Sequence, residues 1–149
     1  MKNFIHTSMI IFLVCVSCNS DDGGDAVQVN ETPEARVCEA THPLVGESRD
    51  LRVSSEYGIS GRVTIISDCE IEISNFFYNG LGPAVSVYGG TDGDFSEGVG
   101  INLSETLNGR RFEGETLTIF LPENTSLDVI NSFSIWCFQF DIDFSSASF

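Results

Sequence analysis

The side chain with the clearest capacity for chemistry is the thiol of Cys137, which lies in a strand-like run over residues 132–144. Alternate residues of a strand point to opposite faces. One face of this run is an unbroken apolar stripe that we predict to face the core: Trp136, Phe138, Phe140, Ile142 and Phe144. Cys137 falls on the other face, which becomes polar toward Asp143. A thiol held on a stiff strand outside the core suits redox chemistry or ligation; a structural cysteine that packs or pairs is the alternative.

The N-terminal segment has the features of a processing signal rather than of a folded element. A positive charge at Lys2 is followed by an apolar run over residues 10–14, which is too short to cross a bilayer as a helix. The run ends in a Cys-Val-Ser-Cys segment that resembles the lipobox of bacterial lipoproteins, with a small serine before the cysteine to be lipidated. We predict a signal peptide over residues 1–17 and a lipid on Cys18, because a bulky valine makes Cys15 the poorer acceptor.

Residues 19–25 are small, polar and acidic, so they cannot bury enough apolar surface to order themselves. They resemble the acidic export signals that follow the lipidated cysteine in surface lipoproteins of the Bacteroidetes group. We predict that residues 18–37 form a flexible tether and that residues 38–149 form one globular domain. The predicted protein is therefore an outer-membrane lipoprotein, exposed at the cell surface and held to the membrane by its acyl anchor.

Composition excludes several classes of function. The chain has 22 acidic and 7 basic residues and a formal net charge of −15 at pH 7, whereas nucleic-acid binding needs basic patches. Beyond the signal the only histidine is His42, and a blue-copper centre needs two histidines with a cysteine. No Gly-x-x-x-x-Gly-Lys phosphate loop is present. We predict no metal site, and an electron-transfer or binding module in preference to a catalyst.

From residue 38 onward the pattern is almost entirely that of strands. Short apolar or alternating runs are separated by turn residues such as Gly89-Gly90 and Asn108-Gly109. The expected strands cover residues 62–66, 70–76, 84–88, 100–103, 116–121 and the terminal run, with the first two joined as a hairpin. Several short strands at this spacing predict an all-β domain, a single antiparallel sandwich or a barrel-like fold.

Two sequence blocks resemble a known family. Residues 73–83 read Ile-Ser-Asn-Phe-Phe-Tyr-Asn-Gly-Leu-Gly-Pro, and residues 134–140 read Ser-Ile-Trp-Cys-Phe-Gln-Phe. In this order and spacing, with residues 59–63 ahead of them, they resemble the DM-thirteen electron-transfer family, an extracellular module that accompanies DOMON domains. The resemblance covers about residues 52–149. It implies a β-rich extracellular domain with one characteristic cysteine.

The resemblance gives a role to Cys137, as a redox thiol or as a ligand of a bound group, and the cofactor it implies is haem or none. It also implies binding residues around the two blocks: Asn75, Tyr78, Gly82, Pro83 and Trp136. A fixed loop without a ligand is the alternative for the first block. Ala84 departs from the family pattern, in which an acidic residue usually follows Gly-Pro, and this weakens the expectation of a polar ligand contact there.

A disulfide also follows from the resemblance. If Cys137 is the family cysteine, Cys38 and Cys69 remain as an extra pair, and in an oxidising compartment they would bond to each other. That bridge would tie the start of the domain to its first hairpin. The rival pairing joins Cys69 to Cys137 and leaves Cys38 free.

These expectations describe a surface-anchored extracytoplasmic lipoprotein domain with a redox or electron-transfer role through Cys137. Its partner is then a redox partner or a surface ligand, besides the membrane that holds its anchor. The alternative is a cofactor-free ligand-binding or adhesion module in which Cys137 is structural. A visible absorption spectrum of the native protein, together with a count of free thiols, separates the two.

Overall fold

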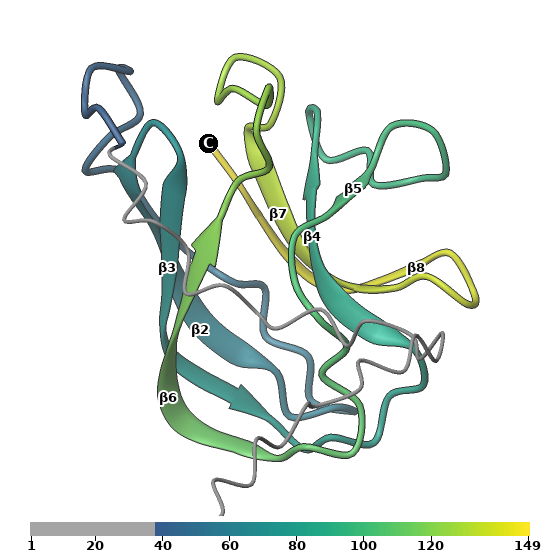
Figure 1. The fold of residues 1–149 in the computed structure, drawn as a ribbon. Helices are drawn as coiled ribbons and strands as arrows, with labels where there is room; N and C mark the ends of the chain where they lie inside the picture. Colours follow the sequence, from purple (N-terminus) through teal and green to yellow (C-terminus); the bar gives the residue numbers. More distant parts are fainter. Residues whose placement is uncertain (1–37) are drawn as a thin grey trace, which may run out of the picture. The chain divides into compact units, whose positions relative to one another are not determined.

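The computed structural model of the protein describes residues 38–149, and the predicted signal peptide, the predicted tether and Cys18 lie outside that range. Within it the chain forms eight strands and no helix (Figure 1). The strands make two antiparallel sheets of four strands each, which confirms the all-β prediction and gives the sandwich arrangement. No helix among the described residues is long and apolar enough to cross a membrane.

The first sheet has the strand order β1-β2-β3-β6. Its strands, coloured blue to green in Figure 1, are β1 (Ser48–Asp50), β2 (Ser60–Ser67), β3 (Glu70–Tyr78) and β6 (Phe112–Phe120). The predicted hairpin is β2–β3, with its turn at Asp68 and Cys69. Strand alternation turns Ile71 and Ile73, both 0% exposed, toward the core and puts Glu72 on the opposite face.

The second sheet has the strand order β5-β4-β7-β8. Its strands are β4 (Val85–Gly90), β5 (Ile101–Asn102), β7 (Ser132–Cys137) and β8 (Ile142–Ser148). Strand β7 is paired along its whole length with β4 on one side and β8 on the other. Its backbone is therefore held on both edges, and the side chains it carries are fixed in direction.

One hydrophobic core lies between the sheets and takes residues from both. The aromatic residues that are almost fully buried in it are Phe76, Tyr78, Phe112 and Phe133. The rings of Phe76 and Phe112 meet edge to face with 5.1 Å between centroids, an arrangement that adds to the stabilisation from burial. At one end of the core, Tyr57 stacks on Phe144 with 4.0 Å between centroids.

The terminal run is two strands joined by a turn, and the prediction of one continuous strand is wrong. Strand β7 ends at Cys137, residues 138–141 form the turn, and β8 begins at Ile142. Phe138 and Phe140 lie in this turn and are 46% and 57% exposed, so they do not extend an apolar stripe into the core. Asp141 closes the turn with a φ of 58°, a conformation that aspartate tolerates better than most residues.

The face assignment of β7 is also reversed relative to the prediction. Phe133, Ile135 and Cys137, each 0% exposed, belong to the core between the sheets. Trp136 is on the outer face of the second sheet, where Phe95 covers it and leaves it 8% exposed. The outer face of β7 carries Ser132 and Ser134 beside Trp136, and the prediction failed because the turn residues Phe138 and Phe140 were counted with Trp136 as one apolar stripe.

Candidate functional site

The thiol of Cys137 lies inside the sandwich, where it is held by the chain between β3 and β4. Its Sγ donates a hydrogen bond to the carbonyl oxygen of Pro83 at 2.9 Å, and the residue is 0% exposed. Among the described residues Cys137 is the one cysteine that is not in a disulfide. The expectation that this thiol lies on a half-polar face, outside the core, is therefore wrong.

Tyr78, at the end of β3, connects the thiol to the rest of the first sequence block. Its hydroxyl accepts a hydrogen bond from the Gly82 amide at 2.9 Å and donates one to the Gly82 carbonyl oxygen at 3.2 Å. Burial raises the pKa of the Tyr78 hydroxyl, the hydrogen bond from the Gly82 amide lowers it by a smaller amount, and electrostatic interactions with Cys137 and Tyr57 add smaller increases. Tyr78 therefore stays protonated and keeps both hydrogen bonds across the physiological range.

Gly82 is required because no side chain fits at its position. A Cβ atom there would lie 2.6 Å from Cε2 of Phe144 and 2.7 Å from the hydroxyl oxygen of Tyr78. The loop is fixed at its start as well, because the Asn79 side-chain oxygen accepts a hydrogen bond from the Leu81 amide at 3.0 Å. Residues 80–84, which we call the cover loop, thus pack tightly against the chain around Cys137.

The cover loop also contains a strained residue. Ala84 has a φ of 45°, in the left-handed region that costs a residue with a Cβ roughly 1–2 kcal/mol. Its carbonyl oxygen accepts a hydrogen bond from the Phe138 amide at 3.2 Å, directly after Cys137. Backbone strain of this kind persists only where the surrounding contacts hold it in place.

The structure brings together four of the predicted site residues and separates two. Tyr78, Gly82, Pro83 and Cys137 form one hydrogen-bonded group at the end of β3 and β7. Asn75 is exposed at a β-bulge of β3, with a φ of 48°, and lines a different surface depression. Trp136 lies on the outer face of the second sheet, next to Cys137 in sequence but on the opposite side of the strand.

The comparison with known proteins supports the family that the two sequence blocks indicated. A family model described as electron transfer DM13 matches residues 51–149. This chain belongs to the DM13 electron-transfer family. The DM13 domain is similar to part of the protein Skeletor of Drosophila melanogaster, at 30% identity over 115 residues for isoforms B/C and likewise for isoforms D/E. The match covers 74% of this chain but only 15% and 8% of those two proteins. No solved structure matches the chain significantly.

Haem, the cofactor that the family resemblance implies, does not fit at Cys137 of this DM13 domain. The Sγ atom has no exposed surface and is committed to the Pro83 carbonyl oxygen. The neighbouring Gly82 has no room even for a methyl group. His42, the one histidine among the described residues, uses Nε2 to bond Asp128 and Nδ1 to accept from the Leu44 amide.

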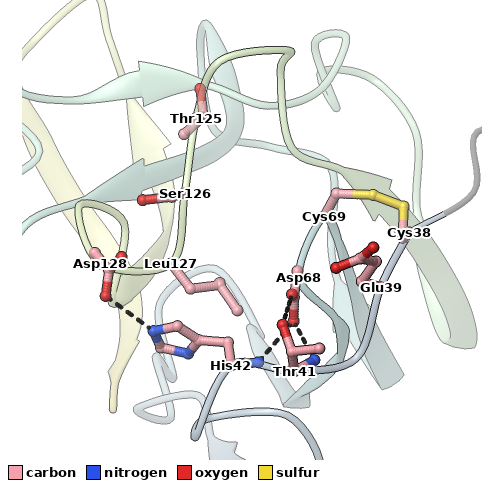
Figure 2. Close-up of a pocket in the computed structure, with 10 residues that line it drawn as sticks. All are labelled: Cys38, Glu39, Thr41, His42, Asp68, Cys69, Thr125, Ser126, Leu127 and Asp128. Atoms are coloured by element: carbon pink, nitrogen blue, oxygen red, sulfur yellow. Dashed lines mark hydrogen bonds and ion pairs between the residues drawn. A yellow bond between two sulfur atoms is a disulfide. The ribbon is translucent and has the colours of Figure 1, made fainter.

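A surface pocket of about 430 Å³ lies beside the disulfide of the DM13 domain and was not predicted (Figure 2). It is formed by the segment before β1, the β2–β3 turn and the loop before β7. Its lining residues are Cys38, Glu39, Thr41, His42, Asp68, Cys69, Thr125, Ser126, Leu127 and Asp128. The His42 ring points across the pocket to Asp128, with 3.2 Å between Nε2 and Oδ1.

Asp68 fastens the segment before β1 to the hairpin. Its carboxylate accepts hydrogen bonds from the backbone amides of Thr41 and His42, each at 2.9 Å, and from the Thr41 hydroxyl at 2.6 Å. These bonds hold the pKa of Asp68 below its ordinary value, and the bond from the Thr41 hydroxyl contributes most.

The disulfide joins Cys38 to Cys69 on the same two segments, which confirms the first of the two predicted pairings. This pocket is thus a structural junction, since the side chains of His42, Asp68 and Asp128 already bond one another or the chain around it.

Proposed function

We propose that this DM13 domain is an extracytoplasmic, lipid-anchored module at the cell surface that acts in redox chemistry through Cys137. The observation that carries the proposal is the hydrogen bond from Cys137 Sγ to the Pro83 carbonyl oxygen, which joins the two sequence blocks typical of the family. Membership in an electron-transfer family supports the redox part. The predicted lipid on Cys18 supports the anchored part.

Access to the thiol depends on the cover loop. Because Cys137 is 0% exposed, a reagent reaches Sγ only when residues 80–84 move away. The strained φ of Ala84 lowers the cost of that movement, since opening the loop releases the strain. Movement of the loop tip removes no large apolar side chain from the core, because Leu81 is 77% exposed.

The chemistry that suits an isolated thiol in an oxidising compartment is oxidation by a hydroperoxide. Sγ of Cys137 takes one oxygen atom, the peroxide O–O bond breaks, and the thiol proton leaves with the second oxygen as water or an alcohol. Two electrons pass from sulfur to the peroxide, and Cys137 becomes a sulfenic acid. No haem or metal takes part in this step.

The test is to trap the sulfenic acid in the folded protein with a dimedone-type reagent after adding hydrogen peroxide, and to locate it by peptide mass. Wild type should be trapped at Cys137 and the Cys137→Ala variant nowhere. Ile135→Val is the matched control, because it removes one methyl group from the same buried face of β7 and should be trapped like wild type. A visible spectrum of the same native protein shows whether a chromophore is present.

Loop variants test the dependence on the cover loop. Asn79→Ala removes the side-chain oxygen that fixes the Leu81 amide, so trapping should be faster than in wild type. Asn75→Ala, in the bulge of β3 and away from the thiol, should leave the trapping rate unchanged. If the sulfenic acid is trapped no faster than the protein unfolds globally in all of these proteins, the redox proposal is wrong.

The second candidate is a cofactor-free binding or adhesion module in which Cys137 is structural. The complete burial of the thiol favours it. If this second candidate is correct, Cys137→Ala should change the stability of the domain and no other property. The variant and wild type should then give equal redox titrations.

A further inference from the structure

A second cavity, of about 440 Å³, opens on the outer face of the second sheet, on the side opposite Cys137. Its lining includes four aromatic side chains: Tyr88 from β4, Phe95 from the loop between β4 and β5, Trp136 from β7, and Phe138 from the β7–β8 turn. The Trp136 ring lies 5.6 Å from Phe95 and 6.4 Å from Tyr88, centroid to centroid, tilted by 43° and 41°. Four rings thus contribute to one cavity, of which Phe95 and Trp136 are buried and Phe138 is 46% exposed.

Two carboxylates belong to the same cavity. Glu97 comes from the loop between β4 and β5, and Asp141 from the β7–β8 turn; both are exposed. Among the described residues that line the cavity there is no lysine, arginine or histidine. The cavity therefore combines electron-rich ring faces with negative charge that no neighbouring cation of the lining neutralises.

Aromatic rings beside carboxylates favour the binding of cations. Ring faces attract a cation through their quadrupole, most strongly for tryptophan, and aromatic enclosures suit alkylated ammonium groups that carry little bound water. Adjacent carboxylates add Coulomb attraction for the same charge. A metal ion fits less well, because no group of three His, Cys, Asp or Glu residues able to hold one occurs in residues 38–149.

We propose that this cavity binds a small organic cation with a quaternary ammonium group, which contacts Phe138 and the accessible part of Trp136, with Glu97 and Asp141 at the rim. The negative net charge of the chain, −15, raises the local concentration of such cations at its surface. The site does not depend on the redox proposal, since Trp136 and Cys137 lie on opposite faces of β7.

The protein supplies its own reporter for the test. Trp136 is the only tryptophan of the chain and forms one wall of the cavity, so tryptophan fluorescence reports on this site alone. Choline chloride is titrated into the protein, with 3,3-dimethylbutan-1-ol as the uncharged analogue of the same shape and sodium chloride as the control for ionic strength. Choline should give a saturable change, and the alcohol and the salt should not.

Variants assign the binding to the rings and the carboxylates. The double change Glu97→Gln with Asp141→Asn, and the single change Phe138→Leu, should each weaken choline binding about three- to thirty-fold. Glu56→Gln with Glu123→Gln removes two exposed charges elsewhere and should leave the affinity close to that of wild type. Cys137→Ala should bind choline like wild type, so this test stands whether or not the thiol is redox-active.

Three results would overturn the proposal. If the uncharged alcohol binds as tightly as choline, the cavity is an apolar site without charge preference. If a neutral disaccharide changes the fluorescence and choline does not, the cavity is a carbohydrate site. If the two charge variants weaken choline binding equally, the attraction comes from the net charge of the chain and not from Glu97 and Asp141.

Discussion

Cys137 donates a hydrogen bond from Sγ to the carbonyl oxygen of Pro83, which lies 54 residues earlier in the chain, at 2.9 Å. The contact joins the two blocks that identify the family, one at the end of β3 and the other at the end of β7. Tyr78 completes the junction, because its hydroxyl bonds both backbone groups of Gly82, the residue before Pro83. The family sequence pattern therefore encodes one buried junction between the two sheets.

Changing Gly82 to alanine should open this junction. The added Cβ would lie 2.6 Å from Phe144, so the cover loop must shift, and stability should fall by about 1–3 kcal/mol in urea denaturation. Labelling of Cys137 by a thiol reagent should become faster. Gly109→Ala is the control: unlike Gly82, Gly109 has a positive φ, 69°, and a Cβ there would meet nothing within 4 Å, so the variant should lose stability through backbone strain without exposing the thiol. Unchanged labelling in Gly82→Ala would mean that the cover loop does not protect Cys137.

The two aromatic residues on either side of Cys137 should differ sharply in their contribution to stability. Trp136 is 8% exposed, and its replacement by alanine should cost about 3–5 kcal/mol through lost burial. Phe138 is 46% exposed in the turn, and the same change there should cost less than about 1 kcal/mol. Denaturation midpoints of the two variants measure the difference. Equal losses of stability would instead support the sequence prediction, in which Trp136 and Phe138 belong to one apolar stripe that faces the core.

Local sequence patterns predicted much of the fold. The β2–β3 hairpin was found because its second strand alternates strictly, with Ile71 and Ile73 inward and Glu72 between them. Asn108-Gly109 marked a real turn, whereas Gly89-Gly90, also predicted as a turn, are the last two residues of strand β4. The sheet order was not accessible, because it depends on long-range pairs such as that of β4 with β7, which no local pattern encodes.

The sequence predicted which residues belong to the candidate site, but not how they are arranged in space. The family blocks pointed to Tyr78, Gly82, Pro83 and Cys137, which the structure brings together. The burial of Cys137 was missed because the residues after it were assigned to the same strand, so that the turn residues Phe138 and Phe140 made the face of Trp136 resemble the core face. The aromatic cavity was missed because residues 88–95 and residues 136–138 meet only through the pairing of β4 with β7.

Removal of the disulfide should destabilise the domain without changing its fold. The bridge between Cys38 and Cys69 closes a loop across 31 residues, for which chain entropy gives about 3–4 kcal/mol. The double change Cys38→Ser with Cys69→Ser should lose this amount in urea denaturation, and reduced wild type should behave alike. Peptide mapping of fresh, unreduced protein should recover a Cys38–Cys69 pair. A Cys69–Cys137 pair would contradict both the bridge and the free thiol.

The lipid anchor predicted for Cys18 has a direct test in the natural host. Cys18→Ser should release the protein from membranes, because the acyl acceptor is lost. Cys15→Ser should remain acylated and membrane-bound, since the small serine before Cys18 makes it the better acceptor. Fractionation and metabolic labelling with a fatty acid measure the two outcomes. Acylated, membrane-bound Cys18→Ser with soluble Cys15→Ser would assign the anchor to Cys15.

Asp68 should make the domain sensitive to acid. Hydrogen bonds from Thr41 and His42 lower its pKa in the folded protein, so the folded state binds this proton less readily than the unfolded chain does. By linkage, the stabilisation is fully present above the unfolded pKa of about 4 and is lost as pH falls through the lower folded pKa.

Asp68→Asn carries no such charge. It should be less stable than wild type at pH 6, and it should lose less stability between pH 6 and pH 2. Glu123→Gln, an exposed carboxylate elsewhere, should follow wild type. Urea denaturation of all three proteins across this range gives the comparison, and parallel curves for Asp68→Asn and wild type would show that the carboxylate does not fasten the segment before β1.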